Sequence, residues 1–236
     1  MEPEESILHA VRKAVETMPR RELGDAALTY VWSDGDLTIE GNVDTVAAKK
    51  LVLERVAAIP GINRIVDRLH VTPAQQMSDA QIRDAVRNAL IEEPALAACG
   101  IYIADKPVRV PPAIEGKIAV SVADGIVTLD GEVCGLGRKR LAGLLAWWVP
   151  GSRDVVNGLG VVPDETDTDD EITDAVRTAL EMDPFVNADQ IRVSTKASVV
   201  TLHGLVPTES ERDRAVADAW YIFGVDKVAN EIEVRP

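Results

Sequence analysis

Val199-Val200-Thr201-Leu202-His203-Gly204 is the stretch that decides the fold, because similar stretches occur twice earlier in the chain. They are Ile126-Val127-Thr128-Leu129-Asp130-Gly131 and Asp36-Leu37-Thr38-Ile39-Glu40-Gly41. Each follows a short turn, and another run rich in aliphatic residues lies before that turn. Two such runs around a turn predict a β-hairpin in each copy. The third copy has Ser198 in its turn where the others have a glycine, so we expect that turn to differ.

A second glycine follows each hairpin at a constant distance. Twenty residues separate Gly41 from Gly61, and the same step joins the other two pairs. Equal spacing in three copies predicts a helix of fixed length with a turn, followed by a closing strand. We expect these glycines to permit tight bends; the alternative is that their backbone amides bind a ligand. The six structural glycines are Gly41, Gly61, Gly131, Gly151, Gly204 and Gly224.

An amphipathic helix is predicted ahead of each hairpin. In the third copy Ile172, Val176 and Leu180 recur every four residues on a polar background, and the other copies have the same stripe. Side chains able to cap these helices stand at Ser78-Asp79 and Asp169-Asp170. Prolines are predicted to end them, at Pro19, Pro94 and Pro184.

These patterns predict an α+β protein made of three tandem αββαβ modules, each a small three-stranded sheet with two helices packed on one face. Module 1 covers residues 1–73, module 2 covers 77–163 and module 3 covers 169–236. Residues 164–171 form a linker with six acidic residues in eight, which we expect to be solvated and mobile. Module 2 has an insertion near 102–116, whose prolines exclude a helix and predict an extended loop.

The composition is that of a globular protein with an aliphatic core, since 46% of residues are hydrophobic and only 4% are aromatic. No apolar run is long enough to span a membrane. The acidic N-terminus lacks the positive start and apolar run of a secretory signal. As written, the chain is therefore expected in the cytoplasm; the alternative is the periplasm, if the native protein has a signal.

The net charge of −14 argues against nucleic-acid binding. The charge is uneven: residues 75–163 carry nine basic and ten acidic groups, whereas 164–236 carry seven and seventeen. Module 2 is consequently repelled least by an anionic surface, and module 3 most.

The copies resemble the BON domain (bacterial OsmY and nodulation) in three motifs. These are the hairpin ending in Val-Thr-Leu-x-Gly, the twenty-residue step to Gly-Val, and a closing Val-x-Asn-x-Ile. Module 3 matches best, with Val200–Gly204, Gly224-Val225 and Val228–Ile232. Module 2 has Asn157 at the closing position, and module 1 departs from the pattern with Asp67 there.

The resemblance implies an αββαβ fold and a non-enzymatic binding or scaffold role of the osmotic or envelope stress type. The family is linked to phospholipid interaction and to secretion and channel proteins, so an anionic phospholipid surface or a protein partner is expected. Some cytoplasmic relatives are linked to potassium, which makes a potassium-binding or ion-sensing protein the alternative.

The second helix of module 2 has the composition of an interfacial helix, with cations at its start and tryptophans at its end. Its equivalent in module 3 also ends in two aromatic residues. We expect these side chains to contact lipid or a partner; the alternative is that the rings pack against a neighbouring module or a second copy in a homo-oligomer. The candidate residues are Arg138, Lys139, Arg140, Trp147, Trp148, Trp220 and Tyr221.

No catalytic, metal or cofactor motif is found. His9, His70 and His203 lie in different modules without the spacing of a metal site. No phosphate-binding loop or nucleophile motif occurs, so we expect no enzyme and no cofactor. The two cysteines, Cys99 and Cys134, are expected to be free, with a single bridge as the alternative.

Overall fold

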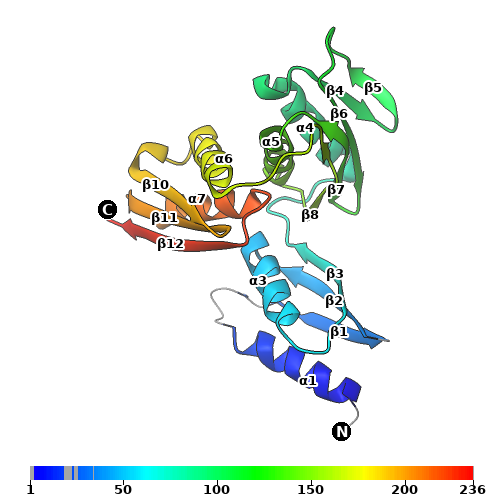
Figure 1. Cartoon of the computed structure of the whole chain (residues 1–236), viewed down its shortest axis with the longest axis vertical. Coiled ribbons are helices and arrows are strands. Elements are labelled where there is room, and N and C mark those ends of the chain that lie inside the picture. Colours follow the sequence, from blue (N-terminus) through cyan, green and yellow to red (C-terminus); the bar gives the residue numbers. More distant parts are fainter. Residues whose placement is uncertain (1–2, 19–22, 24–25, 34, 236) are drawn as a thin grey trace. The chain divides into compact units, whose positions relative to one another are not determined.

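The computed structural model describes residues 3–18, 23, 26–33 and 35–235. The chain divides into two compact units, Met1–Thr72 and Pro73–Pro236. The first unit is module 1, and the second contains modules 2 and 3. Each module has helices against one face of a β-sheet (Figure 1), so the prediction of an α+β protein with three tandem modules is confirmed.

Module 1 has the predicted order of elements. Strand β1 is antiparallel to β2, and β3 joins β2 in parallel, which gives the sheet order β1-β2-β3. Parallel neighbours need a crossover, and the second helix supplies it. The bounds are α1 (Pro3–Glu16), β1 (Leu28–Ser33), β2 (Asp36–Val43), α3 (Val46–Ala57) and β3 (Arg64–Val71). The predicted helix stop at Pro19 lies outside the described residues.

Module 3 repeats this topology, with the sheet order β10-β11-β12 and a parallel pair β11–β12. A short 3-10 turn, η2, precedes its first strand. The bounds are α6 (Asp169–Met182), η2 (Ala188–Gln190), β10 (Ile191–Lys196), β11 (Val199–Val206), α7 (Glu209–Tyr221) and β12 (Lys227–Val234).

Module 2 departs from the predicted three-stranded sheet. Its elements are α4 (Asp79–Glu92), η1 (Pro94–Leu96), β4 (Cys99–Ile103), β5 (Lys106–Arg109), β6 (Gly116–Ala123), β7 (Ile126–Val133), α5 (Leu136–Trp147), β8 (Asp154–Asn157) and β9 (Gly160–Val161). The sheet has six strands in the order β5-β4-β6-β7-β8, with β9 also paired to β7.

The insertion of module 2 is therefore not the predicted loop. Strand β4 lies parallel to β6, and β5 turns back antiparallel to β4. Prolines exclude a helix, but an edge strand tolerates them because its outer N–H groups need no partner. Pro107 lies on β5, which is the edge strand of this sheet.

Hydroxyl side chains cap the starts of α4 and α6. Ser78 caps α4 and Thr168 caps α6, each through a capping box with the third residue of the helix. The predicted cap at Ser78 is confirmed. The predicted cap at Asp169-Asp170 is wrong by one residue, because Thr168 offers the same acceptor one position earlier.

Asp169 instead binds the turn between β10 and β11, which is the hairpin turn without a glycine. Its carboxylate accepts hydrogen bonds from the backbone N–H groups of Ala197 at 2.8 Å and Ser198 at 2.9 Å. Both residues have positive φ, and the two bonds lower the pKa of Asp169. Asp79 binds the turn of module 2 in the same way, through the N–H groups of Asp124 and Gly125 at 3.0 and 2.8 Å.

The glycine that ends each hairpin is required by the close approach of the opposite strand. A Cβ atom on Gly204 would lie 2.1 Å from the carbonyl oxygen of Gln190, and one on Gly131 would lie 2.2 Å from that of Lys117. Gly41 is crowded in the same way, with a backbone oxygen at 2.6 Å. No larger residue fits without a shift of the backbone.

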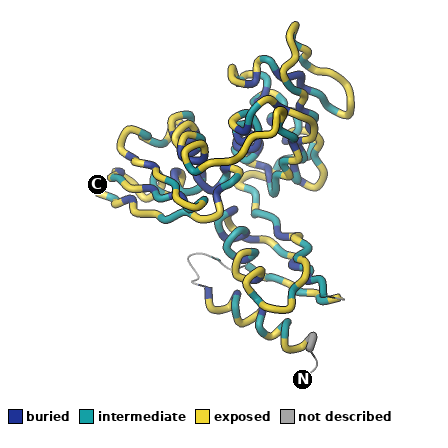
Figure 2. The backbone as a smooth tube through the Cα atoms, viewed as in Figure 1, coloured by how far each residue is buried: buried dark blue, intermediate teal, exposed yellow. Residues whose placement is uncertain are grey.

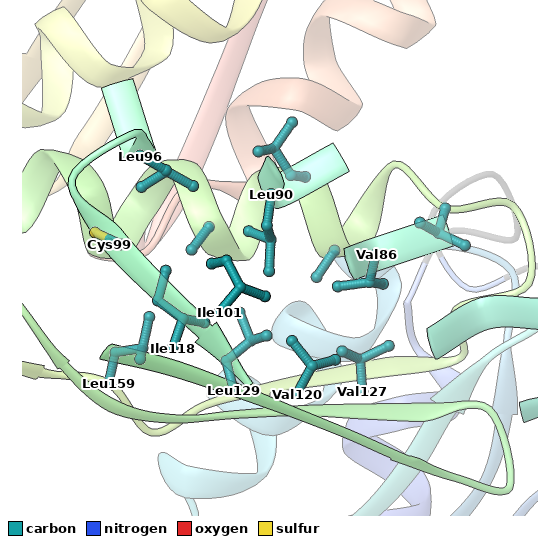
Figure 3. Packing of buried hydrophobic residues seen from close by; sticks show 14 of the residues in the cluster. Val86, Leu90, Leu96, Cys99, Ile101, Ile118, Val120, Val127, Leu129 and Leu159 are labelled. Atoms are coloured by element: carbon teal, nitrogen blue, oxygen red, sulfur yellow. The ribbon is translucent and has the colours of Figure 1, made fainter. Parts of the chain in front are cut away.

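The core of module 2 lies between α4, α5 and the helix-facing side of the sheet (Figure 3). The predicted stripe of α4 is fully buried in it, as Ile82, Val86 and Leu90 are 0% exposed. Ile101 of β4 is also fully buried in this core. The insertion thus contributes to the core and is not a surface appendage.

Residues 164–168 of the acidic linker are exposed, as predicted, but the linker is held by contacts to module 2 and is not the free segment that its composition predicted. Its last three residues already belong to α6. Glu165 accepts a hydrogen bond from the backbone N–H of Leu136 at 2.8 Å, and Asp167 forms an ion pair with Arg140. Composition predicted mobility because it does not show that module 2 offers partners to these carboxylates.

Candidate functional site

The predicted basic and aromatic residues lie on α5 of module 2 and at the end of α7 of module 3. Helices α5, α6 and α7 pack against one another. Helix α5 is buried along most of its length and is largely dark blue in Figure 2. The candidate site is therefore the internal boundary between modules 2 and 3.

The start of α5 is capped from outside the helix. Gly135 at the N-cap has no side chain to offer, and the linker carboxylate of Glu165 takes its place at the N–H of Leu136. A negative charge at a helix N-terminus is stabilised by the helix dipole. This carboxylate offsets the unfavourable position of the three cations in the first turns of α5.

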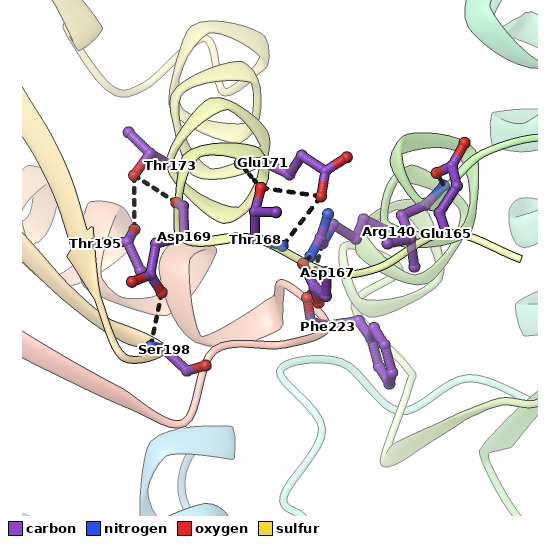
Figure 4. A network of polar contacts seen from close by, with 11 residues as sticks. Arg140, Glu165, Asp167, Thr168, Asp169, Glu171, Thr173, Thr195, Ser198 and Phe223 are labelled. Carbon is purple, nitrogen blue, oxygen red and sulfur yellow. Dashed lines mark hydrogen bonds and ion pairs between the residues drawn. The ribbon is translucent and has the colours of Figure 1, made fainter.

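Arg138 and Arg140 have different partners. Arg138 stays within module 2 and donates to Glu115 Oε2 at 2.8 Å and to the carbonyl oxygen of Ala95 at 3.2 Å. Arg140 is only 2% exposed; its Nε donates to the carbonyl oxygen of Phe223 at 2.9 Å, and its guanidinium pairs with Asp167 (Figure 4). A buried charge needs such partners, so Arg140 ties α5 to the linker and to module 3.

The aromatic side chains interlock across the same boundary. The Trp147 and Tyr221 rings are stacked, with centroids 5.6 Å apart and planes 10° from parallel. Lys139 Nζ lies 4.5 Å from the centroid of the Phe223 ring. Of the two arrangements left open by the sequence, these rings adopt packing between neighbouring modules.

Trp148 forms a hydrogen bond across the boundary, and the sequence did not predict its acceptor. Its Nε1 donates to Asp218 Oδ1 on α7 at 2.9 Å. Asp218 is 2% exposed, and its Oδ2 has no hydrogen-bond partner among the described residues. Burial, reinforced by the carboxylate of Asp183, raises the pKa of Asp218 to about 7. Sequence reasoning missed Asp218 because it stands in an ordinary acidic helix.

A groove of about 610 Å³ lies along the boundary, between α5 and α6. Its floor is apolar, from Leu141 and Leu144 on α5 and Ala175 and Ala179 on α6. Arg138 and Arg140 line it from module 2, and two acidic residues of α6 line it from module 3. Trp220, at 4% exposed, is buried in the same unit and offers no ring to solvent.

The second glycine of each pair lies in the turn after the second helix. Gly61 and Gly224 have positive φ, of 96° and 94°, whereas Gly151 does not. A Cβ on Gly151 would instead meet Met77 at 2.7 Å and Ile82 at 2.9 Å. Together with the crowded hairpin glycines, every one of the six occupies a position set by backbone conformation or close packing.

The insertion of module 2 carries three exposed aliphatic side chains outside the boundary between modules 2 and 3. Val108, Val110 and Ile114 are 46%, 54% and 54% exposed and lie within seven residues. Arg109, between them, is turned inward and donates to the carbonyl oxygens of Ile91 at 2.8 Å, Leu96 at 2.5 Å and Cys99 at 2.9 Å. The sequence predicted the extended conformation but not this anchor.

The described residues contain no group of three or more His, Cys, Asp or Glu placed to hold a metal ion. Within the same residues, no helix has the length and apolar character needed to cross a bilayer. Cys99 is buried and Cys134 is exposed, and both are free thiols. Burial raises the pKa of the Cys99 thiol, which keeps it protonated and unreactive.

Comparison with known proteins gives one clear result. The family model for the BON domain matches residues 4–73, 78–163 and 168–236. No curated protein matches the chain.

Two similar solved structures are of CdsD, a structural protein of the type III secretion system of Chlamydia trachomatis. Its C-terminal domain is 15% identical with a TM-score of 0.28, covering 98% of both chains. The other CdsD structure is 16% identical with a TM-score of 0.26, covering 98% of this chain and 93% of that one. At these values neither bears on what the chain does.

Proposed function

The chain belongs to the BON domain family, with three copies in tandem, and from this we propose a non-enzymatic binding protein that docks on anionic phospholipid surfaces through the insertion of module 2. BON domains are generally associated with phospholipid or protein binding. The observation that carries the proposal is the cluster of exposed aliphatic side chains at Val108, Val110 and Ile114. Single exposed aliphatic residues are ordinary, but three on one short projection mark an interaction surface.

The surroundings of this cluster suit an anionic surface. Lys106 on β5 and Lys117 on β6 are exposed on either side of the cluster, as are Asp105 and Glu115, and module 2 as a whole is nearly neutral in an otherwise acidic chain. Burying three half-exposed aliphatic side chains contributes about 3 kcal/mol. A lysine near an anionic leaflet adds about 1 kcal/mol, which the two carboxylates partly offset. A total of this size corresponds to weak, reversible and salt-sensitive binding.

In this proposal, the basic and aromatic residues of α5 couple modules 2 and 3 and do not contact lipid. The support is that Arg140 is paired and buried and that Trp147 is stacked on Tyr221. Rings engaged in this way would have to leave their partners to enter a headgroup layer. The coupling joins modules 2 and 3 in one compact unit.

Flotation of the full chain with vesicles of phosphatidylglycerol and phosphatidylcholine at low salt tests the proposal. We expect the wild-type chain to float and to be released by salt. Val108→Asp combined with Ile114→Asp should abolish flotation, whereas Val156→Asp should not, although Val156 is equally exposed on β8 of the same module. Trp147→Phe, which keeps a ring on Tyr221, should float like wild type. A wild-type chain that stays in the dense fraction, or equal losses in the test and control variants, would overturn the proposal.

A further inference from the structure

The two modules of the second unit differ at one edge of their sheets. Val120 of β6 pairs with Leu129, and Val193 of β10 pairs with Leu202, so β10 is the equivalent of β6. In module 2, β4 covers the outer side of β6. In module 3, no strand among the described residues lies beside β10, which forms the free edge of its sheet (Figure 1).

Strand β4 shows how such an edge is filled. It runs parallel to β6, with Ile101 opposite Ile118 and Ile103 opposite Val120. Ile101 is 0% exposed, because it lies between α4 and the sheet in the core of the module. The added strand therefore contributes an inward aliphatic side chain as well as backbone hydrogen bonds.

The corresponding position in module 3 is a hollow of about 380 Å³. Arg177 of α6 and Ile191 and Val193 of β10 line it, together with Asp189, Arg192 and His203 among others. Ile191 and Val193 are the equivalents of Ile118 and Val120. Arg177 Nη2 donates to the carbonyl oxygen of Val193 at 3.4 Å, so this carbonyl faces the free edge. A contact of that length is weak, and the Arg177 side chain is 52% exposed, so an incoming strand can replace it.

The charge on the outer face of β10 indicates which outward-facing side chains a strand bound at this edge would carry. Arg192 and Lys196 are exposed on the outer face of β10, and no ion pair is recorded for either among the described residues. Module 2 again supplies the precedent: Lys117 Nζ of β6 lies 4.6 Å from the ring centroid of Tyr102 on β4. Module 3 is acidic overall and Asp189 also lines the hollow. Charges beyond about 8 Å are screened at physiological salt, and along β10 itself Arg192 and Lys196 outnumber Asp189, which precedes the strand.

We propose that the β10 edge of module 3 binds an extended segment of a partner protein, parallel to β10, with aliphatic side chains facing inward and acidic side chains facing outward. The segment takes the place that β4 occupies in module 2. Backbone hydrogen bonds to the edge supply affinity, and the alternation of side chains supplies specificity.

Titration of the ¹⁵N-labelled full chain with the peptide acetyl-Val-Glu-Val-Glu-Val-Glu-Val-amide tests this inference. We expect shifts confined to residues 189–196 and the facing side of α6. Arg192→Glu combined with Lys196→Glu should weaken binding at least tenfold. The matched control is Lys227→Glu, an exposed cation on β12 at the opposite edge of the same sheet, and it should change affinity less than twofold. Thermal melts establish that the variants are folded.

Four outcomes would overturn the inference. They are no binding to the wild-type chain, shifts centred on β12, equal weakening by the control variant, and equal binding of a peptide with lysine in place of glutamate. Light scattering adds a fifth: a wild-type dimer that the β10 variants dissociate would make a second copy of the chain the occupant of this edge.

Discussion

Replacing Asp218 with asparagine should stabilise the unit of modules 2 and 3, and the effect should grow with pH. Asp218 is 2% exposed and accepts a hydrogen bond from Trp148 Nε1 at 2.9 Å. An asparagine keeps that acceptor and removes the buried charge. Around it lie the Asp183 carboxylate and the Arg214 and Tyr221 side chains, and the Asp183 ion pair with Arg214 is complete without Asp218.

The magnitude follows from the pKa of Asp218, which burial raises from 3.8 to about 7. Because the folded-state pKa lies above the unfolded one, the folded chain binds more protons between about pH 4 and pH 7. Its stability therefore falls as pH rises through that window, by about 4 kcal/mol in total. Asp218→Asn does not titrate, so its advantage should be small near pH 4 and about 4 kcal/mol at pH 8, or roughly 8–16 °C in Tm.

Calorimetric melts of the full chain between pH 4 and pH 8 measure this difference. Asp213→Asn is the matched control, since Asp213 lies on the same helix with a 66% exposed side chain and a surface pair contributes little. An advantage of Asp218→Asn that is constant with pH, or a variant less stable than wild type at pH 8, would refute the assignment of a raised pKa to this carboxylate.

Four further substitutions test separate contacts of the second unit. Trp147→Ala should lower the free energy of unfolding in urea by about 2–3 kcal/mol through loss of the stack on Tyr221, and a change below 0.5 kcal/mol would contradict the coupling. Gly204→Ala should destabilise by about 1–3 kcal/mol, because its Cβ meets a backbone oxygen. Gly137 lies in α5, where an added Cβ would meet no atom within 4 Å. Gly137→Ala should therefore stabilise the chain by about 0.5–1 kcal/mol. If both glycine substitutions changed the free energy of unfolding in the same direction, the steric argument would be refuted. Arg109→Ala should accelerate amide exchange in β4 and β5 while β7 stays protected; uniform acceleration would indicate that the hairpin is not a separate element.

The order of the elements could be predicted because it rests on local signals repeated three times. The stripe at Ile82, Val86 and Leu90 and the hairpin glycines encode periodicity and close approach, and the structure places them accordingly. Strands β4 and β5 were missed because Lys106–Arg109 reads as a proline-containing loop. Its pairing depends on the exposed edge of β6, which is a property of the fold and not of the segment.

The composition of the sequence identified the residues of the candidate site, but it did not predict how they are arranged. A basic and aromatic helix predicts either lipid contact or packing, and the choice depends on whether a partner stands opposite. Tyr221 and Phe223 lie far away in the sequence, and only the packing of α7 on α5 brings them to Trp147 and Lys139. Nothing in the sequence predicted that Asp218 is buried, because an acidic residue on an acidic helix is normally solvated.

The aromatic residues that couple modules 2 and 3 have no counterparts in module 1. Module 1 has Ala57 and Ala58 where module 2 has Trp147 and Trp148. A half-buried tryptophan ring contributes about 2–3 kcal/mol of apolar burial that an alanine cannot provide. The end of the second helix is thus a position where the copies differ in the side chains they offer for packing. The edge beside the first hairpin strand is a second such position, filled by β4 in module 2 and open at β10 in module 3. Because neither position belongs to the motifs that define the family, the copies keep one fold while differing in the contacts made at these two positions.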